Sequence, residues 1–124
     1  IICEMVKRLD MPVQIVGCPI VREADGLALS SRNARLSEAE RKQALAISQT
    51  LFKSKEYAGT HTVEETQQFV EASIAAAEGL ELEYFELVDG NTLQKIATWD
   101  ETNYPVGCIT VYCGEVRLID NIKY

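Results

Sequence analysis

Two stretches in the middle of the chain repeat apolar or small residues at helical spacing, and each follows a capping sequence. Ser37 is followed three residues later by Glu40, and Thr62 by Glu65, which is the pattern of a capping box at a helix N-terminus. Gly79 is placed to end the second helix in a left-handed cap. The residues expected to face the core are Ala44, Ile47, Ser48, Leu51 and Phe52 in the first helix and Thr66, Val70, Ile74 and Ala77 in the second.

The last third of the chain changes to the period of a strand. The segment 80–87 alternates apolar and acidic side chains, with Leu80, Leu82 and Tyr84 opposed to Glu81 and Glu83. Residues 89–91 form a turn sequence, and residues 107–120 contain two β-rich runs hinged at Gly114 and Glu115, which suits a type II′ hairpin. Three strands and two helices predict a small α+β domain.

The beginning of the chain has a different pattern. Apolar residues recur at helical spacing over residues 2–9, and the β-branched run at 13–18 ends at Pro19, as expected of a helix followed by a buried strand. The sequence also starts without an initiator Met. We therefore expect residues 1–21 to be the tail of a doubly wound domain whose bulk lies upstream, and residues 22–124 to form a second domain.

Composition limits the possible partners. The 124 residues are 47% hydrophobic and 25% charged, which suits one compact core. The net charge of -7 argues against a broad surface for nucleic acid or anionic membrane, although a small anionic ligand held by a local basic loop is compatible with it. No apolar run suits a membrane span and no secretory leader is visible, so we expect a cytoplasmic protein.

The cysteine and histidine pattern gives little support to a metal site. The four cysteines contain no C-x-x-C pair, and His61 is distant from all of them in sequence. Cys108 and Cys113 are five residues apart on one predicted strand, so their side chains should point to opposite faces. We expect buried, reduced thiols and no protein-held metal.

A polar cluster in the loop 21–33 is the main candidate for chemistry. Ser30 and Ser31 offer hydroxyl groups, and Arg32 offers a planar fork that can bind two phosphate oxygens, so the set suits a polyphosphate. The structural alternative is that the serines solvate backbone and that Arg32 forms a surface ion pair of little energy. Composition and spacing leave both interpretations open.

The longer strings narrow this choice. "VGCPIVREADGLALSSRN" at 16–33 and "VRLIDN" at 116–121 closely resemble the C-terminal domain of the pantothenate synthetase family. The resemblance implies two helices and a three-stranded antiparallel sheet. That resemblance implies a nucleotidyl transferase that joins pantoate to β-alanine and cleaves ATP to AMP and pyrophosphate, with Mg²⁺ bridging the phosphates. The loop would stand where related synthetases carry a KMSKS loop. The positions that match the ATP-binding residues of the family are Val21, Leu29, Ser30, Ser31 and Arg32, and Arg32 is the expected catalytic residue.

The resemblance also implies what lies elsewhere. The family's His-x-Gly-His element, its ATP-binding lysine and its pantoate-binding glutamines belong to an N-terminal, Rossmann-like domain, and His61 does not replace them. The chain is then an ATP lid that needs this N-terminal domain and is inactive alone, in an enzyme expected to be a homodimer. Arg35 stands where the family suggests a tyrosine. Two alternatives are a non-catalytic packing or self-association module and the lid of another adenylate-forming nucleotidyl transferase.

Several other residues receive structural interpretations. We expect Arg22 and Asp25 to brace the loop as an ion pair, with Gly26 as a hinge that lets the loop move. Two aromatic residues, Trp99 and Tyr104, should pack a loop against the sheet, and two charged residues of the last strand, Arg117 and Asp120, should tie that strand to its neighbours.

Overall fold

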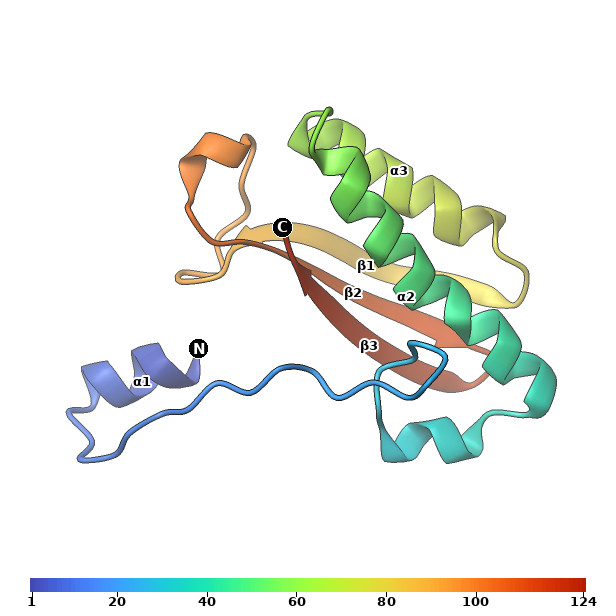
Figure 1. Ribbon diagram of the computed structural model, residues 1–124, viewed down its shortest axis with the longest axis horizontal. Coiled ribbons are helices and arrows are strands. Elements are labelled where there is room, and N and C mark those ends of the chain that lie inside the picture. Colours follow the sequence, from blue (N-terminus) through green and yellow to red (C-terminus); the bar gives the residue numbers. More distant parts are fainter.

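The computed structural model describes residues 1–124 and confirms the predicted α+β architecture (Figure 1). The helices are α1 (Ile2–Arg8), α2 (Glu38–Ala58) and α3 (Val63–Ala76), with short 3₁₀ helices η1 (Ser31–Arg35) and η2 (Trp99–Glu101). The strands are β1 (Leu80–Asp89), β2 (Pro105–Cys113) and β3 (Val116–Lys123). They form one antiparallel sheet in the order β1-β2-β3, so β3 has a neighbour on one side only.

The core lies between the sheet and the two long helices, which run side by side across it in Figure 1. Along β3 buried and exposed residues alternate strictly, as in a strand with one packed face. The fully buried apolar side chains with no measurable exposure are Ala44, Leu51, Val70, Ile74, Val111 and Cys113. No helix of the structure combines the length and apolar content that a membrane crossing requires.

Both predicted capping boxes are present. The Ser37 hydroxyl accepts a hydrogen bond from the Glu40 amide at 3.1 Å, and the Glu40 carboxylate accepts one from the Ser37 amide at 3.0 Å. Thr62 and Glu65 form the same reciprocal pair, with both distances at 3.1 Å. Each box satisfies amide donors that the first helical turn leaves without an intrahelical partner.

The predicted glycine cap of α3 is wrong. The helix ends at Ala76, and its C-cap residue Ala77 has an ordinary φ of -78°. Gly79 does adopt a left-handed φ of +78°, but it lies beyond the cap, directly before β1. Its conformational freedom therefore serves the turn from helix to strand.

The first helical stripe is correct except for Phe52. Ala44, Ile47, Ser48 and Leu51 are buried, whereas Phe52 is 47% exposed. The ring of Phe52 lies under the guanidinium of Arg22, whose carbon is 5.0 Å from the ring centroid. The predicted apolar stripe is thus one residue too wide. Phe52, at its outer side, is covered by the Arg22 guanidinium instead of by core residues.

The alternation in β1 changes phase at a bulge. Leu82 pairs with Val111 and Tyr84 pairs with Thr110, so Glu83 is the extra residue between them. Beyond it Phe85 and Leu87 are buried and Tyr84 is 41% exposed. The prediction that Tyr84 shares the buried face of Leu80 and Leu82 is therefore wrong.

The hairpin between β2 and β3 is confirmed. Cys113 pairs with Val116 across a two-residue loop, and Gly114 has a φ of +61°. Glu115 has no positive φ, which distinguishes this turn from type I′ and agrees with type II′.

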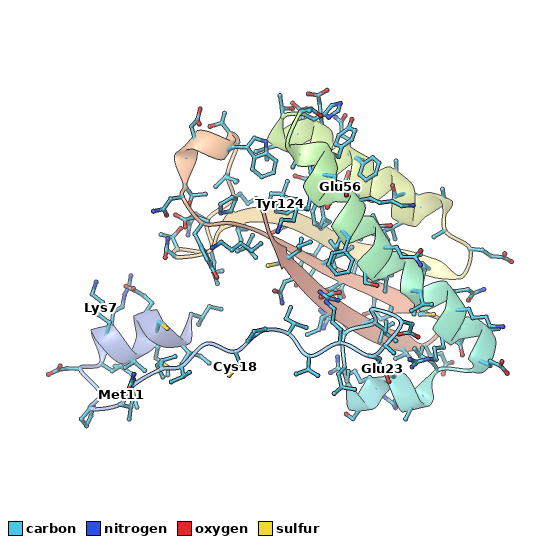
Figure 2. The ribbon with its side chains drawn as sticks, in the orientation of Figure 1. Lys7, Met11, Cys18, Glu23, Glu56 and Tyr124 are labelled. Carbon is cyan, nitrogen blue, oxygen red and sulfur yellow. The ribbon has the colours of Figure 1, made fainter.

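The first 21 residues contain the predicted helix but not the predicted strand. Residues 13–18 have exposed side chains and form no ladder with any strand of the chain. Figure 1 shows α1 and the following segment running clear of the sheet, and Figure 2 shows Lys7, Met11 and Cys18 along it. The strand does not form because no neighbouring strand is available to satisfy its backbone groups.

Candidate functional site

The loop 21–33 folds back on itself as a short irregular hairpin. Its two arms are joined by an Arg22–Ala28 bridge and by a hydrogen bond from the Leu29 amide to the Val21 carbonyl at 2.9 Å. At the tip the Gly26 amide donates to the Glu23 carbonyl at 2.9 Å, and Gly26 has a φ of +96°. Gly26 is thus required by the tight turn, which the loop closes with its own backbone.

The serine and arginine cluster lies where this hairpin enters η1. Ser30 is the N-cap residue, and its hydroxyl oxygen accepts a hydrogen bond from the Arg32 amide at 3.2 Å. The hydroxyl proton of Ser30 remains available for another acceptor. Ser31 and Arg32 are exposed on the first turn of η1.

A pocket of about 250 Å³ lies between this cluster and the outer edge of β3. It is lined by Leu27, Ala28, Leu29, Ser30, Arg32, Asn33, Ile47, Arg117, Leu118, Ile119 and Asp120. The structure therefore brings Leu29, Ser30 and Arg32 to one pocket, and the other two expected ATP-binding residues, Val21 and Ser31, do not line it.

Arg32 has a free charge in the described structure. It forms no ion pair with a carboxylate, and one of its Nη atoms donates to the Arg117 carbonyl oxygen at 3.2 Å. A guanidinium that is held by a neutral carbonyl keeps its remaining donors and its positive charge for an anionic ligand.

The predicted Arg22–Asp25 ion pair is wrong. Arg22 instead binds both carboxylate oxygens of Asp120 on β3, at 2.8 and 3.0 Å. Asp25 binds Arg41 of α2 at 3.1 Å, and Arg41 also binds Glu23 at 2.7 Å. Chain proximity suggested the wrong partner, because the folded sheet brings a better-placed carboxylate to Arg22.

The two carboxylates of the hairpin hold the start of α2. The hydrogen bond that Arg41 donates to Glu23, followed by the nearby charge of Asp25, raises the pKa of Arg41 above its ordinary value. Figure 2 shows Glu23 on the loop beside the N-terminal part of α2. The hairpin is therefore attached to α2 as well as to β3.

Sequence reasoning missed Asn33. Its side-chain amide donates to the Glu23 carboxylate at 3.1 Å and to the Ala28 carbonyl at 3.0 Å, so it ties the end of the loop to its beginning. Asn33 is buried and its Oδ1 atom has no partner in the structure. The residue belongs to the "SSRN" string, which was the available signal, but only the fold shows that it closes the loop.

The residues around the pocket do not fit a magnesium ion held by this chain. Oxygen ligands, and above all carboxylates, are what Mg²⁺ binds in proteins. The Asp120 carboxylate is occupied by Arg22, the Glu23 carboxylate by Arg41 and Asn33, and no group of three His, Cys, Asp or Glu residues is arranged around a common point. No chemical step is therefore assigned to a metal in this chain.

Two expected structural ties are present elsewhere. Arg117 of β3 binds Glu83 of β1 at 2.7 Å across the central strand, and this hydrogen bond lowers the pKa of Glu83 below its ordinary value. Trp99 donates to the His61 carbonyl at 2.9 Å and packs against Tyr124 with ring centroids 5.3 Å apart. Tyr104 instead remains exposed beside Lys123.

The thiols and the unusual arginine have simple surroundings. All four cysteines are free. Cys113 is buried, but Cys3 and Cys18 are exposed, so the prediction of buried thiols is wrong for these two. Arg35 is exposed at the end of η1, near the β2–β3 hairpin. Its side chain forms no ion pair, so the charge of this arginine is accommodated by solvent.

Comparison with known proteins gives a consistent result. Residues 1–123 match the family model described as pantoate-beta-alanine ligase. Pantothenate synthetase of Bacteroides fragilis ATCC 25285 is 70% identical over all 124 residues, and that of Porphyromonas gingivalis W83 is 56% identical. The chain spans 44% of the length of each of these relatives.

Solved structures agree. Pantothenate synthetase from Thermus thermophilus is 36% identical and superimposes with a TM-score of 0.89 over 98% of this chain and 44% of its own. The Francisella tularensis pantoate-beta-alanine ligase complexed with beta-gamma ATP and beta-alanine is 27% identical, with a TM-score of 0.60 over 98% of this chain and 38% of its own. Together, the match over nearly every residue and the shared fold show that the chain belongs to the pantoate-β-alanine ligase family.

Proposed function

We propose that this chain is the ATP-lid part of a ligase that condenses pantoate with β-alanine. Residues 1–21 are the tail of an N-terminal nucleotide-binding domain, and residues 22–124 are the lid. Family membership supports this assignment, as does the related ligase complexed with beta-gamma ATP and beta-alanine. The observation that carries it is Arg32, a guanidinium without a carboxylate partner at a pocket that Ser30 also lines.

The proposed reaction has two steps. A pantoate carboxylate oxygen attacks the α-phosphorus of ATP, the bond from that phosphorus to the bridging oxygen breaks, and pyrophosphate leaves with the electron pair. The amine of β-alanine then attacks the acyl carbon of the pantoyl adenylate, loses a proton, and expels AMP. Negative charge on the phosphate oxygens is greatest as pyrophosphate departs, so donors held near them stabilise the transition state.

The loop residues have distinct roles in this scheme. Arg32 binds oxygens of the departing pyrophosphate, and Ser30 and Ser31 donate hydroxyl hydrogen bonds to the β- and γ-phosphates. Val21 meets the nucleotide through its backbone, and Leu29 belongs to the ATP-binding stretch. Magnesium on the phosphates would be held by the phosphate oxygens and by groups outside this chain, because the carboxylates here already have cationic partners. The homodimer and the cytoplasmic location stay predictions from the sequence.

A second role is favoured by one observation. Many large apolar side chains of residues 1–21 are exposed, and Ile1, Leu9, Val16 and Val21 are among the most exposed. Such a surface suits contact with another polypeptide. We expect that partner to be the N-terminal domain, and sedimentation of the chain alone tests the alternative. A concentration-dependent dimer that a shortened chain starting at residue 22 no longer forms would support self-association.

The ligase proposal is tested with a chimera in which this chain replaces the matching part of the Bacteroides fragilis pantothenate synthetase. AMP release from ATP, pantoate and β-alanine is measured for the unaltered chimera, for Arg32→Ala and for Arg35→Ala. We expect Arg32→Ala to lower kcat by about 100-fold or more, since it removes a transition-state donor. Arg35→Ala, which changes an exposed arginine on the same short helix, should stay within about twofold.

The outcomes separate clearly. An inactive chimera beside an active native enzyme contradicts the proposal that this chain completes the ligase. An active chimera that tolerates Arg32→Ala as well as Arg35→Ala contradicts the role of Arg32 alone. Activity of the chain without the N-terminal domain contradicts the lid assignment.

A further inference from the structure

Two separate segments of the chain, the loop at 21–33 and the segment at 116–121, are in contact through residues that are 85 and 98 positions apart in the sequence. Two interactions join them: Arg32 donates to the Arg117 carbonyl at 3.2 Å, and Arg22 binds Asp120. The proposed function uses only the first segment. Residues 116–121 therefore contact the proposed ATP-binding loop but have no part in the proposed reaction.

The Arg22–Asp120 pair is built for precise placement. Both carboxylate oxygens accept hydrogen bonds from the guanidinium, at 2.8 and 3.0 Å, and the Asp120 side chain is only 4% exposed. The same Arg22 nitrogen that donates the shorter of these bonds also donates to the Gly26 carbonyl at 3.1 Å. One planar group thus fixes the turn of the loop and the edge strand relative to each other.

Only one other hydrogen bond attaches the loop to β3, the one that Arg32 donates to the Arg117 carbonyl. The backbone hydrogen bonds of the loop join its own two arms and do not reach β3. The Arg32 tie to the Arg117 carbonyl must loosen when Arg32 turns toward a phosphate. The remaining hydrogen-bonded connection between the loop and β3 is then the Arg22–Asp120 pair.

We propose that Arg22 and Asp120 are positioning residues for ATP. They hold the loop 21–33 against β3 while Arg32 leaves the Arg117 carbonyl and binds phosphate. The proposal rests on the ligase function proposed above. In this proposal, the "VRLIDN" segment is the part of β3 to which the phosphate-binding loop is attached. The proposal also replaces the hinge expected at Gly26 with a loop that is fixed before the nucleotide arrives.

The direct test uses the chimera described above. Asp120→Asn alone leaves a largely buried arginine without its counter-charge, which destabilises the fold. The informative variant is therefore the double change Arg22→Gln/Asp120→Asn, which removes both charges and keeps two polar side chains. The matched control is Glu83→Gln on β1, which breaks another arginine–carboxylate pair that involves β3, the pair with Arg117 at 2.7 Å.

Two measurements are made on each protein. Amide hydrogen exchange compares residues 27–33 with β2, and steady-state kinetics give kcat and the KM for each substrate. We expect the double variant to exchange at least about tenfold faster at 27–33 and equally in β2, and to raise the KM for ATP by about tenfold or more. The KM for β-alanine should stay within about twofold, and the control should resemble the unaltered chimera in both measurements.

Each outcome decides the inference. Unchanged loop exchange in the double variant overturns it, as does an unchanged KM for ATP in an active chimera. A merely structural pair would speed exchange in the sheet as well and would leave the KM for ATP unaffected. If the unaltered chimera makes no AMP, the proposed function fails, while loop exchange still shows whether the pair holds the loop.

Discussion

Leu51 and Phe52 are neighbours on α2 for which the structure predicts very different costs of truncation. Leu51 is fully buried in the core between the helices and the sheet, whereas Phe52 is 47% exposed beneath Arg22. The apolar pattern of the sequence places both on the buried face. Replacing each with alanine therefore tests whether the structure or the simple pattern describes this helix.

The magnitudes follow from burial. Leu51→Ala loses the transfer free energy of the side chain and leaves a cavity that close packing fills poorly, which costs about 3 to 4 kcal/mol. Phe52→Ala loses the burial of only about half of its ring, worth about 1 kcal/mol, and opens no cavity because solvent can enter. Its contact with the Arg22 guanidinium adds about 0.5 kcal/mol at an exposed site.

The assay is urea unfolding of the chain, followed by circular dichroism and by the fluorescence of Trp99, the single tryptophan. Coincident transitions establish two-state behaviour, and the free energies of unfolding are then compared with that of the unaltered chain. We expect Leu51→Ala to cost at least about twice as much as Phe52→Ala. Equal costs, or a larger cost for Phe52→Ala, would refute the placement of these two side chains.

Three further outcomes are expected. Burial raises the pKa of Tyr124 from 10.0 to about 12, so the phenol ionises at lower pH in the unfolded chain than in the folded one. The free energy of unfolding should therefore fall by about 2 to 3 kcal/mol as the pH rises from 10 to 12, with no loss below pH 10. Tyr124→Phe should remove this decline in alkaline unfolding experiments. Ser37→Ala should lower the free energy of unfolding by about 1 kcal/mol in urea titrations, because it removes one half of a capping box. Burial raises the pKa of the Cys113 thiol, so iodoacetamide should modify the exposed Cys3 and Cys18 first, and Cys113 only on unfolding, as followed by mass spectrometry.

Local signals predicted local structure well. The capping boxes at Ser37 and Thr62 and the hairpin at Gly114 are encoded within a few residues, and the structure contains all three. Their hydrogen bonds join neighbours in the chain, so composition and spacing are sufficient to predict them. The three strands were predicted from the same kind of evidence, and their antiparallel sheet from the family resemblance.

The errors arose where a partner far along the chain decides the outcome. The bulge at Glu83 moves Tyr84 to the exposed face, and it depends on how β1 registers with β2. The apolar run at 13–18 lacks a neighbouring strand and stays unpaired. Alternation alone cannot indicate a change of register or a missing neighbour.

The candidate site also combines features that the local sequence predicts with one that depends on a distant residue. The string that contains Ser30 and Arg32 was identifiable by its resemblance to a family, and the structure brings both residues to one pocket. The partner of Arg22 was not identifiable, because the nearby Asp25 satisfied every local rule while Asp120 lay 98 residues away. The roles of the five residues expected to bind ATP stay predictions until the substitutions are made.

The hairpin formed by residues 21–33 lies beside β3, and this position affects how readily the protein aggregates. β3 is an outer strand, and the unpaired backbone groups along its outer side could pair with the same strand of another molecule. Arg32 of η1 donates to the Arg117 carbonyl of β3 and η1 contacts this strand, which leaves less of its length open to such pairing. Variants that detach the hairpin should therefore lose solubility, which would restrict how freely this loop can be altered.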